Sequence, residues 1–138
     1  HFACAPDPEL DHSLIAKLKE RNCRVSIDVQ SHMSWLTRPD TIDLLRHCDM
    51  FFPNQQEGEW ISGEVGPHRI LRALRNRGIR GVGLKLGGKG AALLWRRREY
   101  LADAFPVECV DTTGAGDSFN AGFIYAWLRG DGPEQCLQ

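Results

Sequence analysis

The chain lacks long apolar runs and an excess of charge of either sign. No apolar stretch reaches the roughly 18 residues that a membrane-spanning helix needs, so we expect no membrane partner. The 17 lysines and arginines are balanced by 18 aspartates and glutamates, which gives a formal net charge of −1. A chain with so little net charge offers no electrostatic reason to bind nucleic acid or an acidic membrane surface.

The patterns of metal sites and disulfide frameworks are missing as well. The five cysteines are scattered, odd in number and without a CxxC pair, and the five histidines lack metal-ligand spacing. The first residues do not combine a positively charged region with an apolar stretch, the pattern of a signal peptide. We therefore expect reduced, mostly buried thiols and a cytoplasmic protein.

What the chain does have is an alternation of short apolar runs and amphipathic segments. We expect strands over 25–29, 50–52, 81–86, 91–95, 99–102 and 107–110. We expect helices that begin at Pro8 and Pro39, and further helices over 55–61, 67–77 and 115–129. Strands that alternate with helices predict an α/β fold, with a mostly parallel sheet and helices on both faces. The helix over 115–129 is apolar nearly all round, so we expect it to be buried.

In sheets of this kind, ligands collect at the carboxyl ends of the strands. Asp28, Asn54, Gly87 and the loop over 111–117 each follow an expected strand. The order of elements therefore predicts that these residues converge on one edge of the sheet.

The strongest chemical signal is Asp111-Thr112-Thr113-Gly114-Ala115-Gly116-Asp117, which leads into an apolar run. Small residues let a ligand approach the backbone, and the free amides and dipole at a helix start favour an anion. Asp117 adds a carboxylate that could accept a proton from an attacking hydroxyl. The segment indicates phosphoryl transfer from a nucleotide to an alcohol. A first-turn dipole partner without a catalytic role is the alternative for Asp117.

The order DTTGAGDSFNAGFI over residues 111–124 resembles the C-terminal signature of the PfkB carbohydrate kinases, the ribokinase-like family. The resemblance implies a three-layer ribokinase-like fold and a phosphotransferase that uses ATP and Mg²⁺ to phosphorylate a hydroxyl of a small sugar. By resemblance, Asp117 is the catalytic base. Gly114, Ala115 and Gly116 would form, with the Asp117 amide, the anion hole for the transferring phosphoryl group.

Within the same signature, Asp111 and Thr113 match positions that often help to bind a monovalent cation in such kinases, which here would be K⁺. Two other segments of the chain, over 54–57 and 84–91, match the family in kind and order. The segment Asn54-Gln55-Gln56-Glu57 looks like the family's NxxE motif, in which Glu57 would order Mg²⁺ through water and Asn54 would support the phosphates. A capping box at a helix start is the alternative for Asn54 and Glu57, and the two interpretations are compatible.

The segment over 84–91 looks like the family's strand-to-turn element beneath the nucleotide. Gly87 and Gly90 would let the backbone lie close to the ligand, and Lys85 would lie near the phosphates or the base. An ordinary glycine turn between two strands is the alternative.

Asp28 departs in part from the family pattern. Members often show D-x-N after this strand, whereas this chain has Gln30 where the asparagine would stand. A role at the acceptor or phosphate site and a loop-capping role therefore both remain open for Asp28.

The arginines and tryptophans have plainer interpretations. Arg69, Arg72, Arg75, Arg77 and Arg80 flank the apolar positions of one helix and predict a solvated face. The run Arg96-Arg97-Arg98 is expected to keep a hairpin tip soluble. Trp35, Trp60, Trp95 and Trp127 are expected to pack at the core or its rim.

By resemblance, residues 1–138 are the C-terminal part of a PfkB kinase domain, without its N-terminal part and lid. We therefore expect a piece of a longer protein, which could homodimerise and whose acceptor is not readable from this part. A nucleoside or other small-alcohol kinase and a non-catalytic nucleotide-binding homologue are the alternatives to a sugar kinase.

Overall fold

The computed structural model describes residues 1–3, 8–30 and 33–138, with the side chains of residues 8–11 outside that description. Its centre is a five-stranded sheet in the order β1-β2-β3-β4-β5. The strands are β1 (Ser26–Ile27), β2 (Met50–Phe51), β3 (Gly81–Lys85), β4 (Ala91–Trp95) and β5 (Arg98–Ala102). The first three strands pair in parallel, while β4 and β5 join in antiparallel fashion. The α/β class is confirmed, but the sheet is mixed rather than mostly parallel, because short turns connect β3, β4 and β5.

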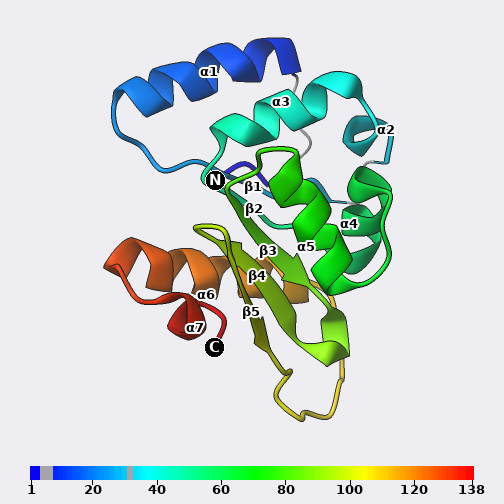
Figure 1. Ribbon diagram of the computed structural model, residues 1–138. Helices are drawn as coiled ribbons and strands as arrows, with labels where there is room; N and C mark the ends of the chain where they lie inside the picture. The colour runs from blue at the N-terminus through cyan, green and yellow to red at the C-terminus, as the bar shows by residue number, and fades with distance from the viewer. Residues whose placement is uncertain (4–7, 31–32) are drawn as a thin grey trace.

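Helices cover both faces of the sheet (Figure 1). One group comprises α1 (Pro8–Glu20), α2 (Met33–Leu36), α3 (Pro39–His47), α4 (Gln55–Ser62) and α5 (Pro67–Asn76). The other face carries α6 (Ala115–Arg129) and α7 (Pro133–Cys136), and a single 3₁₀ turn, η1 (Gly87–Lys89), links β3 to β4. Proline opens α3, α5 and α7, where its fixed φ and missing N–H cost nothing. No helix in the described part of the chain is long and apolar enough to cross a membrane.

The central strands β3 and β4 send alternate side chains to opposite faces, as a pleated strand must. On one face, the buried residues Val82, Leu84, Ala92 and Leu94 pack with the helices α1 to α5. On the other face, Ala91 and Leu93 pack with Phe123 of α6. The sheet therefore separates two cores, and α6 belongs to the smaller one.

The expectation that α6 is buried all round is wrong. Asn120 and Phe123 are its buried residues, whereas Tyr125 and Leu128 expose 64% and 61% of their surface. The helix packs on the sheet through one side, by way of Phe119, Phe123 and Trp127. Its opposite side contacts nothing in the described residues that would bury those two side chains.

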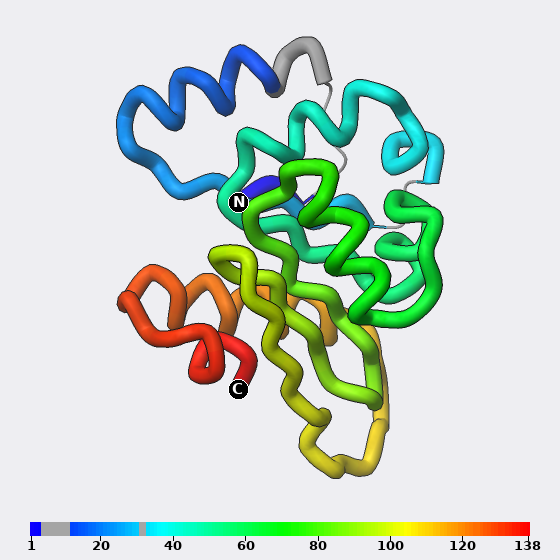
Figure 2. Tube along the Cα trace, in the orientation of Figure 1, coloured from blue at the N-terminus to red at the C-terminus, as the bar shows by residue number. Residues whose placement is uncertain are grey.

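The segment between β5 and α6 also differs from its expectation. No strand forms over 107–110, and Val107 and Val110 expose 80% and 95% of their surface. The chain here follows a long open loop beyond the end of the β4–β5 hairpin before it returns to α6 (Figure 2). A strand needs a partner for its ladder, and none of the described strands lies beside this segment.

The thiols agree in part with expectation. Cys48 and Cys136 are buried, Cys23 and Cys109 are exposed, and none of these four forms a disulfide within the described residues. Burial raises the pKa of the Cys136 thiol. Cys4 lies outside the described residues.

Candidate active site

The carboxyl ends of the parallel strands bring together residues that are far apart in the sequence. Asp28 follows β1, Asn54 follows β2, and Lys85 ends β3. Asn54 and Lys85 are neighbours in a parallel bridge, and the Lys85 amide donates a hydrogen bond of 2.9 Å to the Pro53 carbonyl. The convergence predicted for this edge is confirmed for Asp28, Asn54 and the start of α6, as the contacts below establish, and Lys85 joins them there.

A buried ion pair lies at the centre of this edge. Lys85 Nζ donates to Asp28 Oδ2 at 2.6 Å, and Asn120 Nδ2 donates to the same oxygen. The Asp28 Oδ1 atom accepts from the Gln30 amide at 3.3 Å. Asp28 exposes only 4% of its surface, so three donors compensate a carboxylate that is almost removed from water. Asp28 thus links β1, β3 and α6, and also caps its own loop.

Asn120 is a site residue that the sequence analysis missed. It is 2% exposed, and its Oδ1 atom has no hydrogen-bond partner among the described residues. Such an acceptor is costly when it is left unpaired, which makes Asn120 a candidate for contact with a ligand. The signal was available, because Asn120 lies inside the 111–124 motif, one helical turn after Gly116.

The start of α6 is built to receive an anion. Gly114 is its N-cap with φ +74°, and no side chain caps the helix. Ala115 and Ser118 have backbone acceptors, whereas the described residues supply none for the amides of Gly116 and Asp117. Free amides at a helix start and the helix dipole together favour negative charge.

Lys85 adds a full positive charge beside these amides. Its Nζ atom lies 3.4 Å from the position that a Cβ on Gly116 would occupy. Asp117 is exposed in the first turn of the same helix. The arrangement can therefore hold a phosphate on amides and an ammonium group, with a carboxylate at hand for a proton.

Asn54 and Glu57 form the capping box that the sequence analysis weighed as an alternative. Asn54 Oδ1 accepts from the Glu57 amide at 2.9 Å, and Glu57 Oε2 accepts from the Asn54 amide at 2.8 Å. Glu57 is only 1% exposed, and its bond with the Asn54 amide holds its carboxylate beside the carboxyl end of β2. No three His, Cys, Asp or Glu side chains of the described residues are grouped so that they could hold a metal ion. A Mg²⁺ role of Glu57 through water stays a prediction that this geometry allows.

Asp111 and Thr113 lie in the exposed loop that precedes α6. The Thr113 amide donates to Asp111 Oδ1 at 2.8 Å, and this hydrogen bond holds the pKa of Asp111 below its usual range. The carboxylate thus stays charged, as a cation ligand must. Its binding of K⁺ stays a prediction.

Gly87 and Gly90 differ in what surrounds them. Gly87 has φ +60° and no atom within 4 Å of an added Cβ, so the backbone there is open to a ligand. At Gly90, with φ +92°, a Cβ would lie 2.0 Å from the Ala102 carbonyl oxygen. The close approach at Gly90 is to β5, which accounts for the glycine by packing alone.

Substitution of Gly90 by alanine is expected to lower the free energy of unfolding by roughly 3 kcal/mol, from backbone strain and a clash with the fixed backbone of β5. The matched control is Gly88→Ala, because Gly88 has open space beside it. We expect the control to change stability by less than about 0.5 kcal/mol. Urea denaturation of both variants tests this, and equal midpoints would contradict the packing at Gly90.

Comparison with known proteins gives consistent matches. The sequence profile described as "pfkB family carbohydrate kinase" matches residues 2–138. An uncharacterized sugar kinase of Archaeoglobus fulgidus is 38% identical over 97 residues, which cover 70% of this chain and 38% of the relative. A cytidine kinase of Thermococcus kodakarensis is 29% identical over 141 residues, covering 100% of this chain and 50% of the relative.

A solved structure of a ribokinase is also similar to this chain. The structure of Arabidopsis thaliana ribokinase complexed with ribose and ATP matches with a TM-score of 0.81 and 29% sequence identity, over 95% of this chain and 43% of that chain. The chain therefore spans half or less of the length of the three proteins it is compared with. The ribokinase-like fold is confirmed.

Proposed function

The chain belongs to the PfkB family of carbohydrate kinases, and from this premise we propose that its protein transfers a phosphoryl group from ATP, with Mg²⁺, to a hydroxyl of a small sugar. The observation that carries the proposal is the uncapped start of α6, where free amides, the Lys85 ammonium and Asp117 meet. We further propose that residues 1–138 form the C-terminal part of a longer kinase domain. Each matched relative is at least twice the length of its matched region, which supports this.

Different residues of the chain would take different roles in this reaction. Gly114, Ala115 and Gly116, with the Asp117 amide, would hold the phosphoryl group, and Lys85 would neutralise part of its charge. Asp117 would take the proton from the acceptor hydroxyl as its oxygen bonds to the γ-phosphorus, while the bond from that phosphorus to the bridging oxygen breaks and ADP leaves. Mg²⁺, when bound, would neutralise phosphate charge, with Glu57 orienting its water shell.

ATP fits the donor set at this edge. Asn54, Lys85 and Gly87 are the residues we assign to the nucleotide, and Asn54 and Lys85 are neighbours at the carboxyl ends of β2 and β3. Gly87 leaves its backbone open on the same edge. The unpaired Asn120 oxygen offers one further acceptor there.

A nucleoside acceptor is the second candidate. The similarity to a cytidine kinase extends along the whole chain, which favours this alternative over other small alcohols. Dependence on K⁺, a homodimer and a cytoplasmic location stay predictions that accompany either acceptor.

The test is ATP turnover, with Mg²⁺, by the full-length protein across a panel of sugars and nucleosides. We expect one sugar to give a kcat/KM at least about tenfold above every nucleoside, a ratio that a few acceptor hydrogen bonds supply. Turnover with nucleosides alone would promote the second candidate. ATP binding without turnover of any acceptor would instead favour a non-catalytic nucleotide-binding protein.

A further inference from the structure

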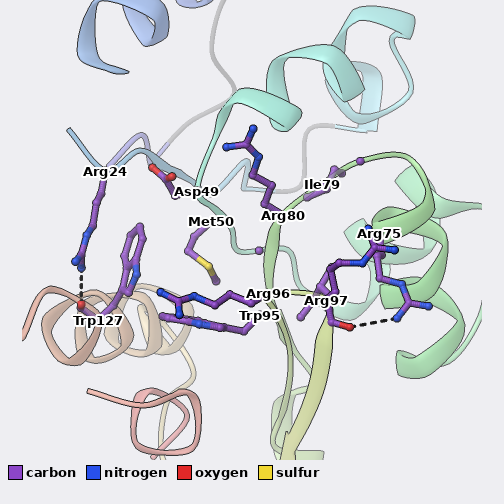
Figure 3. Close-up of a pocket in the computed structure, with 13 residues that line it drawn as sticks. Arg24, Asp49, Met50, Arg75, Ile79, Arg80, Trp95, Arg96, Arg97 and Trp127 are labelled. Atoms are coloured by element: carbon purple, nitrogen blue, oxygen red, sulfur yellow. Dashed lines mark hydrogen bonds between the residues drawn. The ribbon is translucent and has the colours of Figure 1, made fainter. Parts of the chain in front are cut away.

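A cavity of about 530 Å³ is lined by residues at the amino ends of β2 and β3, the ends opposite the candidate active site. Figure 3 shows its lining side chains. Its walls come from the starts of β2 and β3, the turn between β4 and β5, and the end of α6. Met50, Trp95 and Trp127 give it an apolar interior. None of the residues assigned to phosphoryl transfer lines it, because those residues lie at the other ends of the same strands.

The rim of this cavity is strongly cationic. Five arginines line it, against a single carboxylate, so its formal charge is +4: Arg24, Arg75, Arg80, Arg96 and Arg97 against Asp49. Asp49 is already engaged, since it accepts from Lys19 and, at 2.7 Å, from the Val25 amide. Asp49 therefore neutralises little of the positive charge of the arginines around it.

Arg75 lies 4.0 Å from the carboxylate of Glu99, whereas the other four arginines form no ion pair within the described residues. The side chains of Arg80 and Arg96 are exposed and form no ion pair or hydrogen bond within the described residues. Arg24 is partly committed, as it donates to the Trp127 carbonyl and lies 5.1 Å from the centre of that indole. Arginines without counter-ions that line one cavity give it a positive potential, so the arrangement favours an anionic ligand.

The turn that carries Arg96 and Arg97 is strained. The two residues alone connect the paired residues Trp95 and Arg98, and their φ angles are +48° and +69°. Glycine and asparagine suit both positions of such a turn, whereas a residue with a long side chain costs about 1 kcal/mol or more in each. The hairpin thus has arginine at two turn positions where the backbone conformation disfavours a long side chain. Both positions lie beside a cavity that lacks negative charge. Strain of this kind is often retained for a function.

We propose that this cavity binds an oligophosphate anion, either free or as the polyphosphate group of a nucleotide. Guanidinium groups pair with phosphate oxygens through two parallel hydrogen bonds, and several arginines can share a chain of phosphates. The two indoles supply flat apolar surface for the base of a nucleotide. The proposal does not depend on the proposed kinase activity, because the two sites share no residue.

The direct test is calorimetric titration of the full-length protein with inorganic pyrophosphate. Arg80→Gln/Arg96→Gln removes two charges from the rim, and Arg72→Gln/Arg98→Gln removes two exposed charges outside the cavity as the matched control. We expect the rim variant to bind at least about tenfold more weakly, as loss of charge-assisted hydrogen bonds predicts, and the control to stay within about twofold of the wild type. Equal weakening in both variants, or none in the rim variant, overturns the proposal.

A second titration, with ADP, distinguishes the two sources of the phosphate group. The ADP affinity that depends on the rim is obtained as the difference between the wild type and the rim variant. Binding of ADP at the candidate active site is common to both proteins and cancels in this difference. A rim-dependent affinity above that for pyrophosphate supports a nucleotide, and an affinity no higher supports the free anion. ADP and pyrophosphate binding that are both independent of the rim overturn the proposal.

A third variant, Arg96→Gly, distinguishes a loss of the binding site from a loss of folding. Glycine adopts the φ of +48° without strain, so we expect this variant to have a higher Tm and yet a weaker affinity for pyrophosphate. A loss of binding that accompanies a gain in stability has no explanation in unfolding. A gain in Tm with unchanged binding overturns the assignment of Arg96 to the site.

Discussion

Replacing Asp117 by asparagine in the full-length protein is expected to lower kcat by about 10³-fold, the contribution of a positioned general base. Asparagine keeps the size of the side chain and the backbone amide at the start of α6, but it cannot accept the proton of the acceptor hydroxyl. The KM for ATP is therefore expected to change little. Steady-state kinetics with the acceptor found in the panel, together with ATP binding by calorimetry, measures both effects.

The control for this variant is Asp43→Asn. Asp43 is exposed on α3 and pairs at the surface with Arg46, which is not a residue of the candidate site. We expect its kcat to equal that of the wild type, and its stability to fall by less than about 1 kcal/mol. Asp117→Asn also loses an acidic group from a helix start, which costs about 0.3–1 kcal/mol, so thermal denaturation must accompany the kinetics. Near-normal turnover in Asp117→Asn would remove Asp117 as the base.

The edge at which the site forms could be predicted because it depends on local patterns. Alternating strands and helices place strand ends together, so Asp28, Asn54, Gly87 and the loop over 111–117 were expected to converge before any contact was known. Proline and the Asn54–Glu57 capping box likewise fixed the starts of α3, α4 and α5. These signals act over a few residues and need no knowledge of distant packing.

The features of the fold and the site that could not be predicted depend on contacts between distant segments. The bond from Asn120 to Asp28 spans 92 residues, and no local pattern encodes it. The apolar composition of α6 predicted burial on every side, but burial depends on which elements cover the helix, and Tyr125 and Leu128 remain exposed.

The arginines are a third case of the same kind. Arg75 and Arg80 were expected on a solvated helix face and Arg96 at a hairpin tip, and Arg80 and Arg96 are indeed exposed. What the sequence analysis missed is that these side chains surround one cavity. They come from α5, the start of β3 and the β4–β5 turn, so only the packing of three elements brings them together.

Replacing Lys85 by methionine is expected to lower the free energy of unfolding by about 3–5 kcal/mol, because it leaves the carboxylate of Asp28 buried without its counter-ion. The methionine stem fills much of the same space, so the loss reports the charge rather than a cavity. Urea denaturation of the full-length protein measures it. The exposed pair of Arg46 with Asp43 is the control, and Asp43→Asn, which removes the negative charge of that pair, is expected to cost less than about 1 kcal/mol.

A double-mutant cycle separates the structural role of this pair from its role in the reaction. Asp28→Leu/Lys85→Met removes both charges, so most of the stability lost in Lys85→Met is expected to return. Activity is not expected to return with it, because the ammonium group beside Gly116 is still missing. If turnover recovers together with stability, Lys85 acts only by holding β1, β3 and α6 together. If stability recovers and kcat stays low, the charge of Lys85 acts on the phosphoryl group, and Asp28 is the residue that positions it there.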